Sequence, residues 1–201
     1  MSFDEQAAAW DTKERAMRAK RIAEQIDFVI GDRKYRHALD FGAGTGLISF
    51  SLTNAPEKIT LLDSSSEMLR VASEKQSATK AHLEILCADI VEKDCLTDKY
   101  DLIYSSMVFH HVRDIEAAMV TLSSHLENAG KMIIVDLVSD DGAFHRDDTD
   151  FDGHNGFEAK TFADIMLAQG YTDITSEIFF SGRKNKTVPY SLFMVSGIRR
   201  I

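Results

Sequence analysis

The run His37–Leu47, HALDFGAGTGL, constrains the fold of this chain more than any other stretch. A short apolar segment ends in Asp40, and glycines then follow at alternate positions: Gly42, Gly44 and Gly46. The apolar segment 47–52 comes next and is expected to open a helix. Glycine has no Cβ and tolerates positive φ, so a glycine turn between strand and helix lets the backbone approach a ligand closely.

Short apolar runs recur along the chain, and amphipathic segments separate them. The predicted strands that follow the first are Lys58–Asp63, Leu83–Asp89, Tyr100–Ser106 and Lys131–Val138, with a final hairpin of Asp173–Phe180 and Tyr190–Gly197. The predicted helices include Thr12–Ile30, capped by Asp11, one opened by Ser64 and Glu67 at capping-box spacing, one capped by Asp114, and Thr161–Gln169. This alternation predicts a mostly parallel α/β sheet covered on both faces.

Polar residues stand where the predicted parallel strands end. They are Asp40, Asp63, Asp89, Ser105 and Asp136. In open α/β sheets ligands bind beyond the carboxyl ends of the strands, so these side chains are expected to meet at one edge. A lone acid at such a position has the alternative role of capping the next helix, but several beside a glycine turn favour a binding site.

Composition limits the classes of protein and partner. At 201 residues, one domain spanning 1–201 is expected, with two cysteines predicted to be reduced thiols in a cytoplasmic protein. The net charge of −9 disfavours nucleic-acid partners, which are bound largely through Lys and Arg. No leader peptide or membrane span is expected, so no membrane partner is predicted. The oligomeric state stays open.

The order D-x-G-x-G-x-G at positions 40–46 resembles motif I of the class I S-adenosylmethionine-dependent methyltransferases. A dinucleotide fingerprint would instead place its third glycine where Leu47 stands. Strand four reads SSMV rather than the N-P-P-Y or D-P-P-Y of nucleic-acid amine methyltransferases. The segments SSMVFHHV, DGAFH and HNGF resemble the small-molecule branch related to ubiquinone- and menaquinone-biosynthesis methyltransferases.

The resemblance covers residues 40–198 and implies a Rossmann-like, doubly wound, mostly parallel seven-stranded sheet with an antiparallel last strand. It implies Asp63 on the ribose diol, Asp89 with the Ile90 N–H on adenine, and Asp40 with the glycine backbone near the ligand ammonium. The implied cofactor-binding set is Asp40, Gly42, Ala43, Gly44, Gly46, Asp63, Ser64, Met68, Asp89, Ile90 and Ser105.

Two segments are expected to cover the site: residues 1–30, as a lid and helix, and the loop 139–160, which at about twenty residues is long for a compact domain. His110 and His154 are the candidate catalytic bases, because imidazole titrates near neutrality. The expected substrate-pocket residues are Trp10, His111, His145 and Phe157. Each of these side chains has packing or solvent exposure as an alternative role.

The loop residues His145, Asp147, Asp148, Asp150, Asp152 and His154 contain ligand types for a metal, but their spacing matches no metal motif, so no metal is predicted. The predicted function is methyl transfer from S-adenosylmethionine to a small molecule, releasing S-adenosylhomocysteine. The alternatives are a noncatalytic S-adenosylmethionine-binding module and a nicotinamide-dependent oxidoreductase. Protein or RNA methylation ranks lower within the enzyme class.

Overall fold

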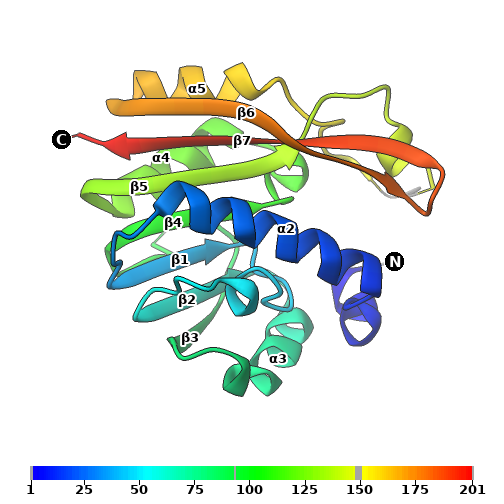
Figure 1. The fold of residues 1–201 in the computed structure, drawn as a ribbon, viewed down its shortest axis with the longest axis horizontal. Coiled ribbons are helices and arrows are strands. Elements are labelled where there is room, and N and C mark those ends of the chain that lie inside the picture. The colour runs from blue at the N-terminus through cyan, green and yellow to red at the C-terminus, as the bar shows by residue number, and fades with distance from the viewer. Residues whose placement is uncertain (1, 93, 148–150, 201) are drawn as a thin grey trace.

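A seven-stranded sheet forms the centre of the molecule, as Figure 1 shows for the computed structural model, which describes residues 2–92, 94–147 and 151–200. The strand order is β3-β2-β1-β4-β5-β7-β6. The strands are β1 (His37–Phe41), β2 (Lys58–Asp63), β3 (His82–Cys87), β4 (Tyr100–Ser106), β5 (Leu126–Leu137), β6 (Tyr171–Lys184) and β7 (Val188–Arg199). Strands β1 to β5 pair in parallel, while β7 is antiparallel to β5 and to β6. The predicted Rossmann-like sheet with an antiparallel last strand is confirmed.

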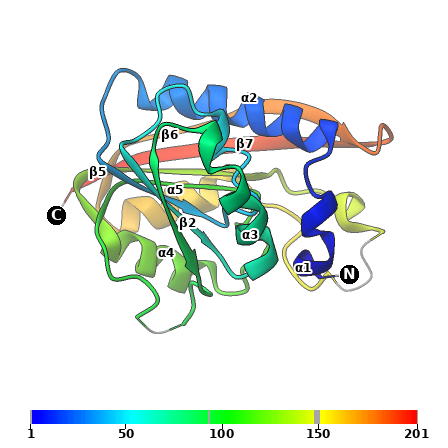
Figure 2. The ribbon, with the colours of Figure 1, turned by 90° about the horizontal axis from the view of Figure 1, so that it is seen from below.

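Helices cover both faces of this sheet (Figure 2). They are α1 (Phe3–Gln6), α2 (Lys13–Ile30), α3 (Ser66–Glu74), α4 (Ile115–His125) and α5 (Ala159–Ala168). Buried residues of α2 and α3 share one core cluster, and those of α4 and α5 share the other. The sheet is therefore the middle layer of three, which explains why its parallel strands are apolar with little alternation.

Successive side chains of strand β1 point alternately into the two cores on either side of the sheet. Ala38 packs into the core beneath α2 and α3, whereas Leu39 and Phe41 pack into the core beneath α4 and α5. Successive strand residues point to opposite faces, so Asp40 points to the α2 side. The strand direction brings this acid to the carboxyl edge of the sheet.

Two predicted helix caps are wrong by one residue. Thr12 rather than Asp11 caps α2, accepting from the N–H of Arg15, because Asp11 accepts a hydrogen bond from the Thr45 hydroxyl. Ser65 rather than Ser64 caps α3. The residues expected to cap these helices, Asp11 and Ser64, lie instead at the carboxyl edge of the sheet.

The helix expected after the glycine turn is only a 3₁₀ turn, Ser49–Ser51. Asp27 of α2 explains its early end, because its carboxylate accepts the N–H groups of Thr53 and Asn54 and so holds the chain in a loop. The final hairpin is longer than predicted, because β6 and β7 stay paired from Tyr171↔Arg199 to Lys184↔Val188.

The remaining 3₁₀ turns are Ala7–Ala9, Gln76–Ala78, Phe109–His111 and Ala143–His145. Predicted loop 139–160 is anchored by a bridge between Val138 and Phe157, and its end belongs to α5. Asp148 and Asp150 of this loop lie outside the described residues.

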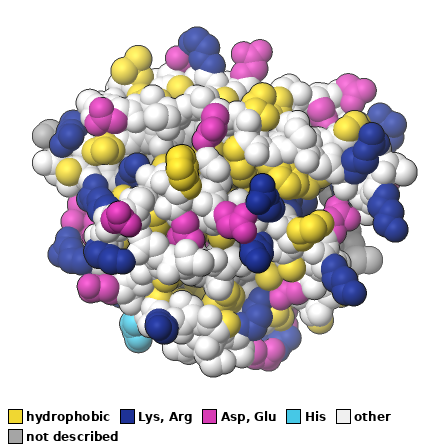
Figure 3. All heavy atoms as spheres, in the orientation of Figure 1, with side chains coloured by type: hydrophobic (Ala, Val, Ile, Leu, Met, Phe, Trp, Pro, Cys, Tyr) yellow, Lys and Arg dark blue, Asp and Glu magenta, His cyan; other side chains and the backbone are white. Residues whose placement is uncertain are grey.

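The surface facing the viewer in Figure 3 carries charges of both signs, with hydrophobic side chains scattered between them. Among the described helices, none combines the length and apolar character needed to cross a membrane.

Candidate cofactor and substrate site

A cleft of about 540 Å³ lies at the carboxyl ends of β1, β2 and β4. The glycine turn and the acids at the strand ends line one part of it, and the N-terminal segment with the start of α2 lines another. Its volume is within the range of small-molecule and cofactor sites. The position is the one that the sheet topology predicts for a ligand.

The glycine turn at the bottom of the cleft adopts positive φ at Gly42 (72°), Gly44 (53°) and Gly46 (76°). The N–H groups of Gly42 and Ala43 both donate to the Leu62 carbonyl, which fastens the turn to β2.

The three glycines differ in what surrounds them. A Cβ on Gly42 would lie 2.1 Å from Val108 Cγ2, and one on Gly46 would lie 2.4 Å from the Phe50 ring. A Cβ on Gly44 would meet nothing nearer than Trp10 Nε1 at 4.0 Å. Gly42 and Gly46 therefore permit internal packing, and Gly44 is the glycine that leaves space for a ligand. Gly42, Ala43 and Gly44 line the cleft, whereas Gly46 does not.

Asp63, at the end of β2, lines the cleft beside this turn. Its Oδ2 accepts the N–H of Gly44 at 2.7 Å, and its Oδ1 accepts the N–H of Ser65 at 2.9 Å. Burial raises the pKa of Asp63, and these backbone hydrogen bonds oppose the rise. Each carboxylate oxygen has two lone pairs, so both oxygens retain capacity to accept from a ligand hydroxyl.

Asp40 is almost fully buried at 2% exposure but still contributes to the cleft wall. Its Oδ2 accepts the Ser49 hydroxyl at 2.6 Å, and Ser49 Oγ lies 2.7 Å from the Tyr104 hydroxyl. Burial raises the pKa of Asp40 to about 7, with the nearby charge of Asp63 adding to the rise. A cation bound near Asp40 would favour its ionised form.

Asp89 and Ile90 lie just beyond β3 and line the cleft at its far end from α2. Asp89 also closes a local turn, since its Oδ1 accepts the N–H of Val91 at 3.1 Å. Ser64 and Met68 line the cleft as well. Ser105 does not: it is 1% exposed, and the next residue, Ser106, lies in the wall instead. The alternation of β4 turns Ser105 away from the cleft.

The N-terminal segment covers the opposite side of the cleft. Phe3 and Trp10 line it, with their rings edge to face at 5.7 Å. Two hydrogen bonds hold the segment down, from the Ser65 hydroxyl to Asp4 at 2.6 Å and from the Thr45 hydroxyl to Asp11 at 2.5 Å. Both partners are at the cleft edge, so the segment lies over the glycine turn.

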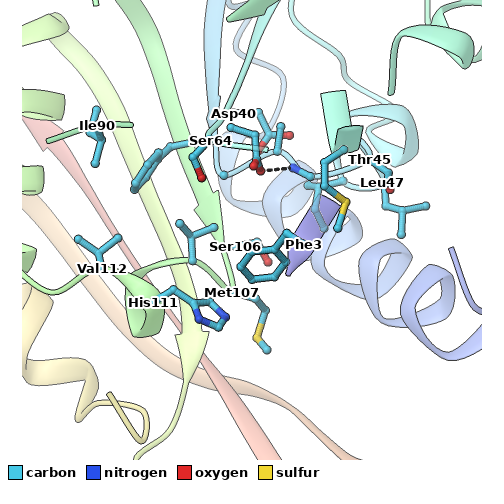
Figure 4. A pocket seen from close by; sticks show the side chains of 18 of the residues that line it. Phe3, Asp40, Thr45, Leu47, Ser64, Ile90, Ser106, Met107, His111 and Val112 are labelled. Atoms are coloured by element: carbon cyan, nitrogen blue, oxygen red, sulfur yellow. Dashed lines mark hydrogen bonds between the residues drawn. The ribbon is translucent and has the colours of Figure 1, made fainter. Parts of the chain in front are cut away.

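Histidine placement differs from the sequence-based expectation. His111 lines the cleft, and Figure 4 shows it near Phe3 and Met107, away from Asp40 and Ser64. The remaining candidates lie outside the cleft lining: His110 is buried against Asp136, and His154 places Nε2 3.0 Å from the Val112 carbonyl oxygen. Neither ring therefore lines the cleft in this structure.

His145 and Phe157 are also absent from the cleft wall. Both are 8% exposed and lie outside the cleft lining, His145 in a histidine cluster and Phe157 in the core beneath α5. The bridge from Val138 to Phe157 pulls this part of the loop into the sheet. Loss of solvation lowers the pKa of His111 to about 4, with the charge of His110 adding to the effect. Its imidazole is therefore neutral at neutral pH.

Several wall residues carried no sequence signal. Arg15 and Arg18 of α2 line the cleft, and Arg15 places its guanidinium 3.8 Å from the Trp10 ring centre. Their i, i+3 spacing places them on one helix face, but only the packing of α2 shows that this face meets the cleft. Phe3 was likewise included only within the general N-terminal segment.

Comparison with known proteins finds methyltransferases as relatives. A family model described as a methyltransferase domain matches residues 38–130. An uncharacterized methyltransferase of Schizosaccharomyces pombe is 31% identical over 115 residues, covering 53% of this chain and 40% of that protein. An uncharacterized methyltransferase of Geobacillus kaustophilus is 26% identical over 182 residues, covering 89% and 81%.

A malonyl-[acyl-carrier protein] O-methyltransferase of Bacillus cytotoxicus is 27% identical over 135 residues, covering 65% of this chain and 46% of the relative. The chain thus spans less than half the length of two of these three relatives.

Solved structures show the same fold at low identity. The Haloferax volcanii complex of the Trm112 methyltransferase activator with a methyltransferase partner matches with a TM-score of 0.77 at 15% identity, covering 100% of this chain and 98% of that one. The N-methyltransferase NodS of Bradyrhizobium japonicum, in complex with S-adenosylhomocysteine, matches at 0.67 and 14% identity, covering 93% and 86%. The glycine motif, the sheet order and these relatives agree, and the chain is similar to the class I S-adenosylmethionine-dependent methyltransferases, with a methyltransferase-domain match over residues 38–130.

Proposed function

We propose that this chain transfers the methyl group of S-adenosylmethionine to a small-molecule acceptor. The observation that carries the proposal is the cleft itself, in which the carboxylates of Asp63, at the end of β2, and Asp89, just beyond β3, follow in a row on one side of a glycine turn with open space at Gly44. A nucleoside with a diol and a cationic amino-acid end matches these acceptors. The similarity to methyltransferases supports the choice of cofactor and reaction class.

Individual roles follow from position. Asp63 accepts hydrogen bonds from the ribose diol, and Asp89 with the Ile90 N–H binds adenine at the far end of the cleft. Asp40 and the backbone at Gly42–Gly44 lie near the ligand ammonium. Ser64 and Met68 complete the wall beside the ribose. Ser105 and Gly46 are not part of this proposal, because neither lines the cleft.

The chemical step is an in-line displacement at the methyl carbon. The sulfonium is already activated, so this chain contributes alignment and exclusion of water. Phe3 and His111 line the part of the cleft away from Asp40 and Ser64, where the acceptor would approach the methyl group, while Trp10 lies next to Gly44. His111 is the proposed acceptor-side residue, in place of His110 and His154.

A small acceptor agrees with the size of the cleft. The relative from Bacillus cytotoxicus is named for a malonyl group, a small carboxylate that its acyl-carrier protein holds. Three cations line the cleft, Arg15, Arg18 and Arg113, although Arg113 also pairs with Asp152. Guanidinium groups recognise carboxylates well, which favours an acceptor bearing a carboxylate. A single-domain organisation and a cytoplasmic location remain part of the same proposal.

The test has two arms. Calorimetry with S-adenosylhomocysteine and with NADH separates a methyltransferase site from a nicotinamide site, and the proposal requires binding of the first only. A panel of carboxylate, amine, phenol and thiol acceptors is then incubated with S-adenosylmethionine, and release of S-adenosylhomocysteine is measured. Cofactor binding without turnover on any acceptor would favour the noncatalytic module.

A further inference from the structure

Three imidazoles gather beside the cleft. His110 and His111 belong to the 3₁₀ turn after β4, and His145 belongs to the turn Ala143–His145 after β5. One ring nitrogen from each histidine lies within 4.8 Å of the other two. The ring centre of His110 is 4.2 Å from that of His111 and 5.1 Å from that of His145. The cluster therefore joins two segments that are distant in the sequence.

Asp136 fixes the orientation of the central ring. His110 Nδ1 lies 2.6 Å from Asp136 Oδ1, and the carboxylate also accepts the N–H groups of Leu137 and His110. Both side chains are withdrawn from solvent, at 2% exposure for His110 and 0% for Asp136. An ionised carboxylate only accepts, so Nδ1 is the nitrogen that donates to Asp136, and Nε2 is the nitrogen left for a metal. A carboxylate behind a histidine in this way is the usual second partner of a metal-binding imidazole.

The other two rings are held by packing. His145 stacks on Phe151 with 3.7 Å between ring centres and 5° between planes, and Phe3 meets His111 edge to face at 5.2 Å. The loop is fixed next to His110, because the N–H of His154 donates to the His110 carbonyl at 2.7 Å. A Cβ on Gly153 would come within 2.0 Å of that oxygen, so the approach requires glycine.

The donor set is chemically selective. Neutral imidazole suits zinc, iron, copper and nickel, and three histidines with a fourth position left open form a known type of zinc site. Metal–nitrogen bonds of about 2.0–2.1 Å place ligand nitrogens roughly 3.3 Å apart in a tetrahedral site. Binding therefore requires the three nitrogens, which lie within 4.8 Å of one another, to move closer together.

A second group in the described part of the chain makes a useful contrast. His37, Glu84 and Asp98 also bring three possible ligands together. The ammonium of Lys58 already occupies their centre, at 2.8 Å from Glu84 and 3.3 Å from Asp98. A cation is thus present in that group, whereas the three possible ligands of the other group, His110, His111 and His145, are all imidazoles.

We propose that His110, His111 and His145 bind one divalent transition-metal ion, with Asp136 orienting His110 from behind. His111 belongs both to this cluster and to the cleft wall, so the remaining coordination position lies next to the methyl-transfer site. An oxygen or nitrogen of the acceptor would bind there, a consequence that rests on the proposed function. Binding of the ion itself does not depend on that function.

The experiment uses the full, untagged chain, stripped with a chelator and titrated with Zn²⁺ by calorimetry and with Co²⁺ by visible absorption. The expected result is one ion per chain and the intense ligand-field bands of four-coordinate Co²⁺. His111→Ala and His145→Gln are each expected to weaken binding at least tenfold. His154→Gln is the matched control: it lies on the same loop, bonded to the Val112 carbonyl and outside the cluster, and is expected to bind as the wild type does.

Wild-type protein that takes up no stoichiometric metal overturns the proposal, and so does equal affinity in His111→Ala. If His145→Gln does not fold, the metal affinity of His111→Ala decides alone, because His111 is exposed and its replacement leaves the core intact. S-adenosylhomocysteine binding is measured on the same samples. A wild-type chain that binds S-adenosylhomocysteine but no metal rejects the metal site only. A wild-type chain that does not bind S-adenosylhomocysteine rejects the proposed function.

Discussion

The backbone N–H of Gly44 donates to Oδ2 of Asp63 at 2.7 Å, which joins the glycine turn after β1 to the acid at the end of β2. The Ser65 N–H donates to the other oxygen of the same carboxylate. A single side chain thus holds the turn and the start of α3 in place while lining the cleft. Binding and local structure both depend on Asp63.

Removing this carboxylate should weaken cofactor binding strongly. A hydrogen bond to a charged group contributes roughly 1.5–3 kcal/mol, so Asp63→Ala is expected to raise the Kd for S-adenosylhomocysteine on the order of tenfold to a hundredfold. Asp63→Asn, which keeps the shape, should fall between that variant and the wild type. Calorimetry measures both, with Glu67→Gln on nearby α3 as a charge control that pairs with Arg70 instead. Unchanged affinity in folded Asp63→Ala would contradict the ribose role.

A side chain at position 44 is predicted to hinder ligand binding rather than packing against neighbouring residues. The added methyl group of Gly44→Ala would have Trp10 Nε1, at 4.0 Å, as its nearest neighbour. The stability cost therefore comes from positive φ alone and is of order 1–3 kcal/mol. The methyl group faces the cleft, and the Kd for S-adenosylhomocysteine should rise by at least tenfold. Denaturant unfolding and calorimetry on the same samples separate the two effects.

Gly31→Ala serves as the strain control for that experiment. Gly31 ends α2 with φ 59° and ψ −143°, and an added methyl group there would have no neighbouring atom within 4 Å. Unlike Gly44, it is remote from the cleft lining. The variant should lose stability and keep its affinity. Equal affinity losses in both glycine variants would show that strain, not contact with the ligand, weakens binding.

Asp40 should make stability depend on pH. Its pKa is raised by burial from 3.8 to about 7, so the folded state binds this proton more strongly than the unfolded state does. The contribution of Asp40 to stability is therefore greatest below pH 4 and falls as the pH rises towards about 7. Asp40→Asn removes this titration. The free energy of unfolding, measured for both proteins from pH 4 to pH 8, should decline less for the variant; parallel curves would contradict the raised pKa.

Trp10 is the one tryptophan of the chain, so its fluorescence reports on the lid segment. Its ring lines the cleft and lies beneath the Arg15 guanidinium. S-adenosylhomocysteine is expected to shift or quench the emission in a saturable way, with the same Kd as calorimetry. Asp63→Ala should move that midpoint to higher concentration. Calorimetric binding with unaltered emission would place the ligand away from the lid.

The sequence by itself determined the sheet and the identity of its ligand-bearing edge. Apolar runs that end in Asp40 and Asp63, with alternate glycines after the first, are local features whose geometry follows from backbone sterics and strand direction. The placement of Asp89, Ile90, Ser64 and Met68 in the cleft wall agrees with motif position for the same reason. Ser105 lies outside the cleft lining, and Ser106 within it, because one residue along β4 reverses the side-chain direction.

Only the tertiary structure decided what the histidines do. His110 and His154 stand in sequence segments that suggest a catalytic role. In the structure His110 Nδ1 is hydrogen-bonded to the buried Asp136, and His154 Nε2 lies 3.0 Å from the Val112 carbonyl oxygen. His110, His111 and His145 have no metal-motif spacing, because the contact depends on how a loop folds back across the end of β4. The arginines Arg15 and Arg18 of α2 line the cleft for a similar reason. The packing of α2 on the sheet decides which face of this helix meets the cleft, and the order of its residues does not show it.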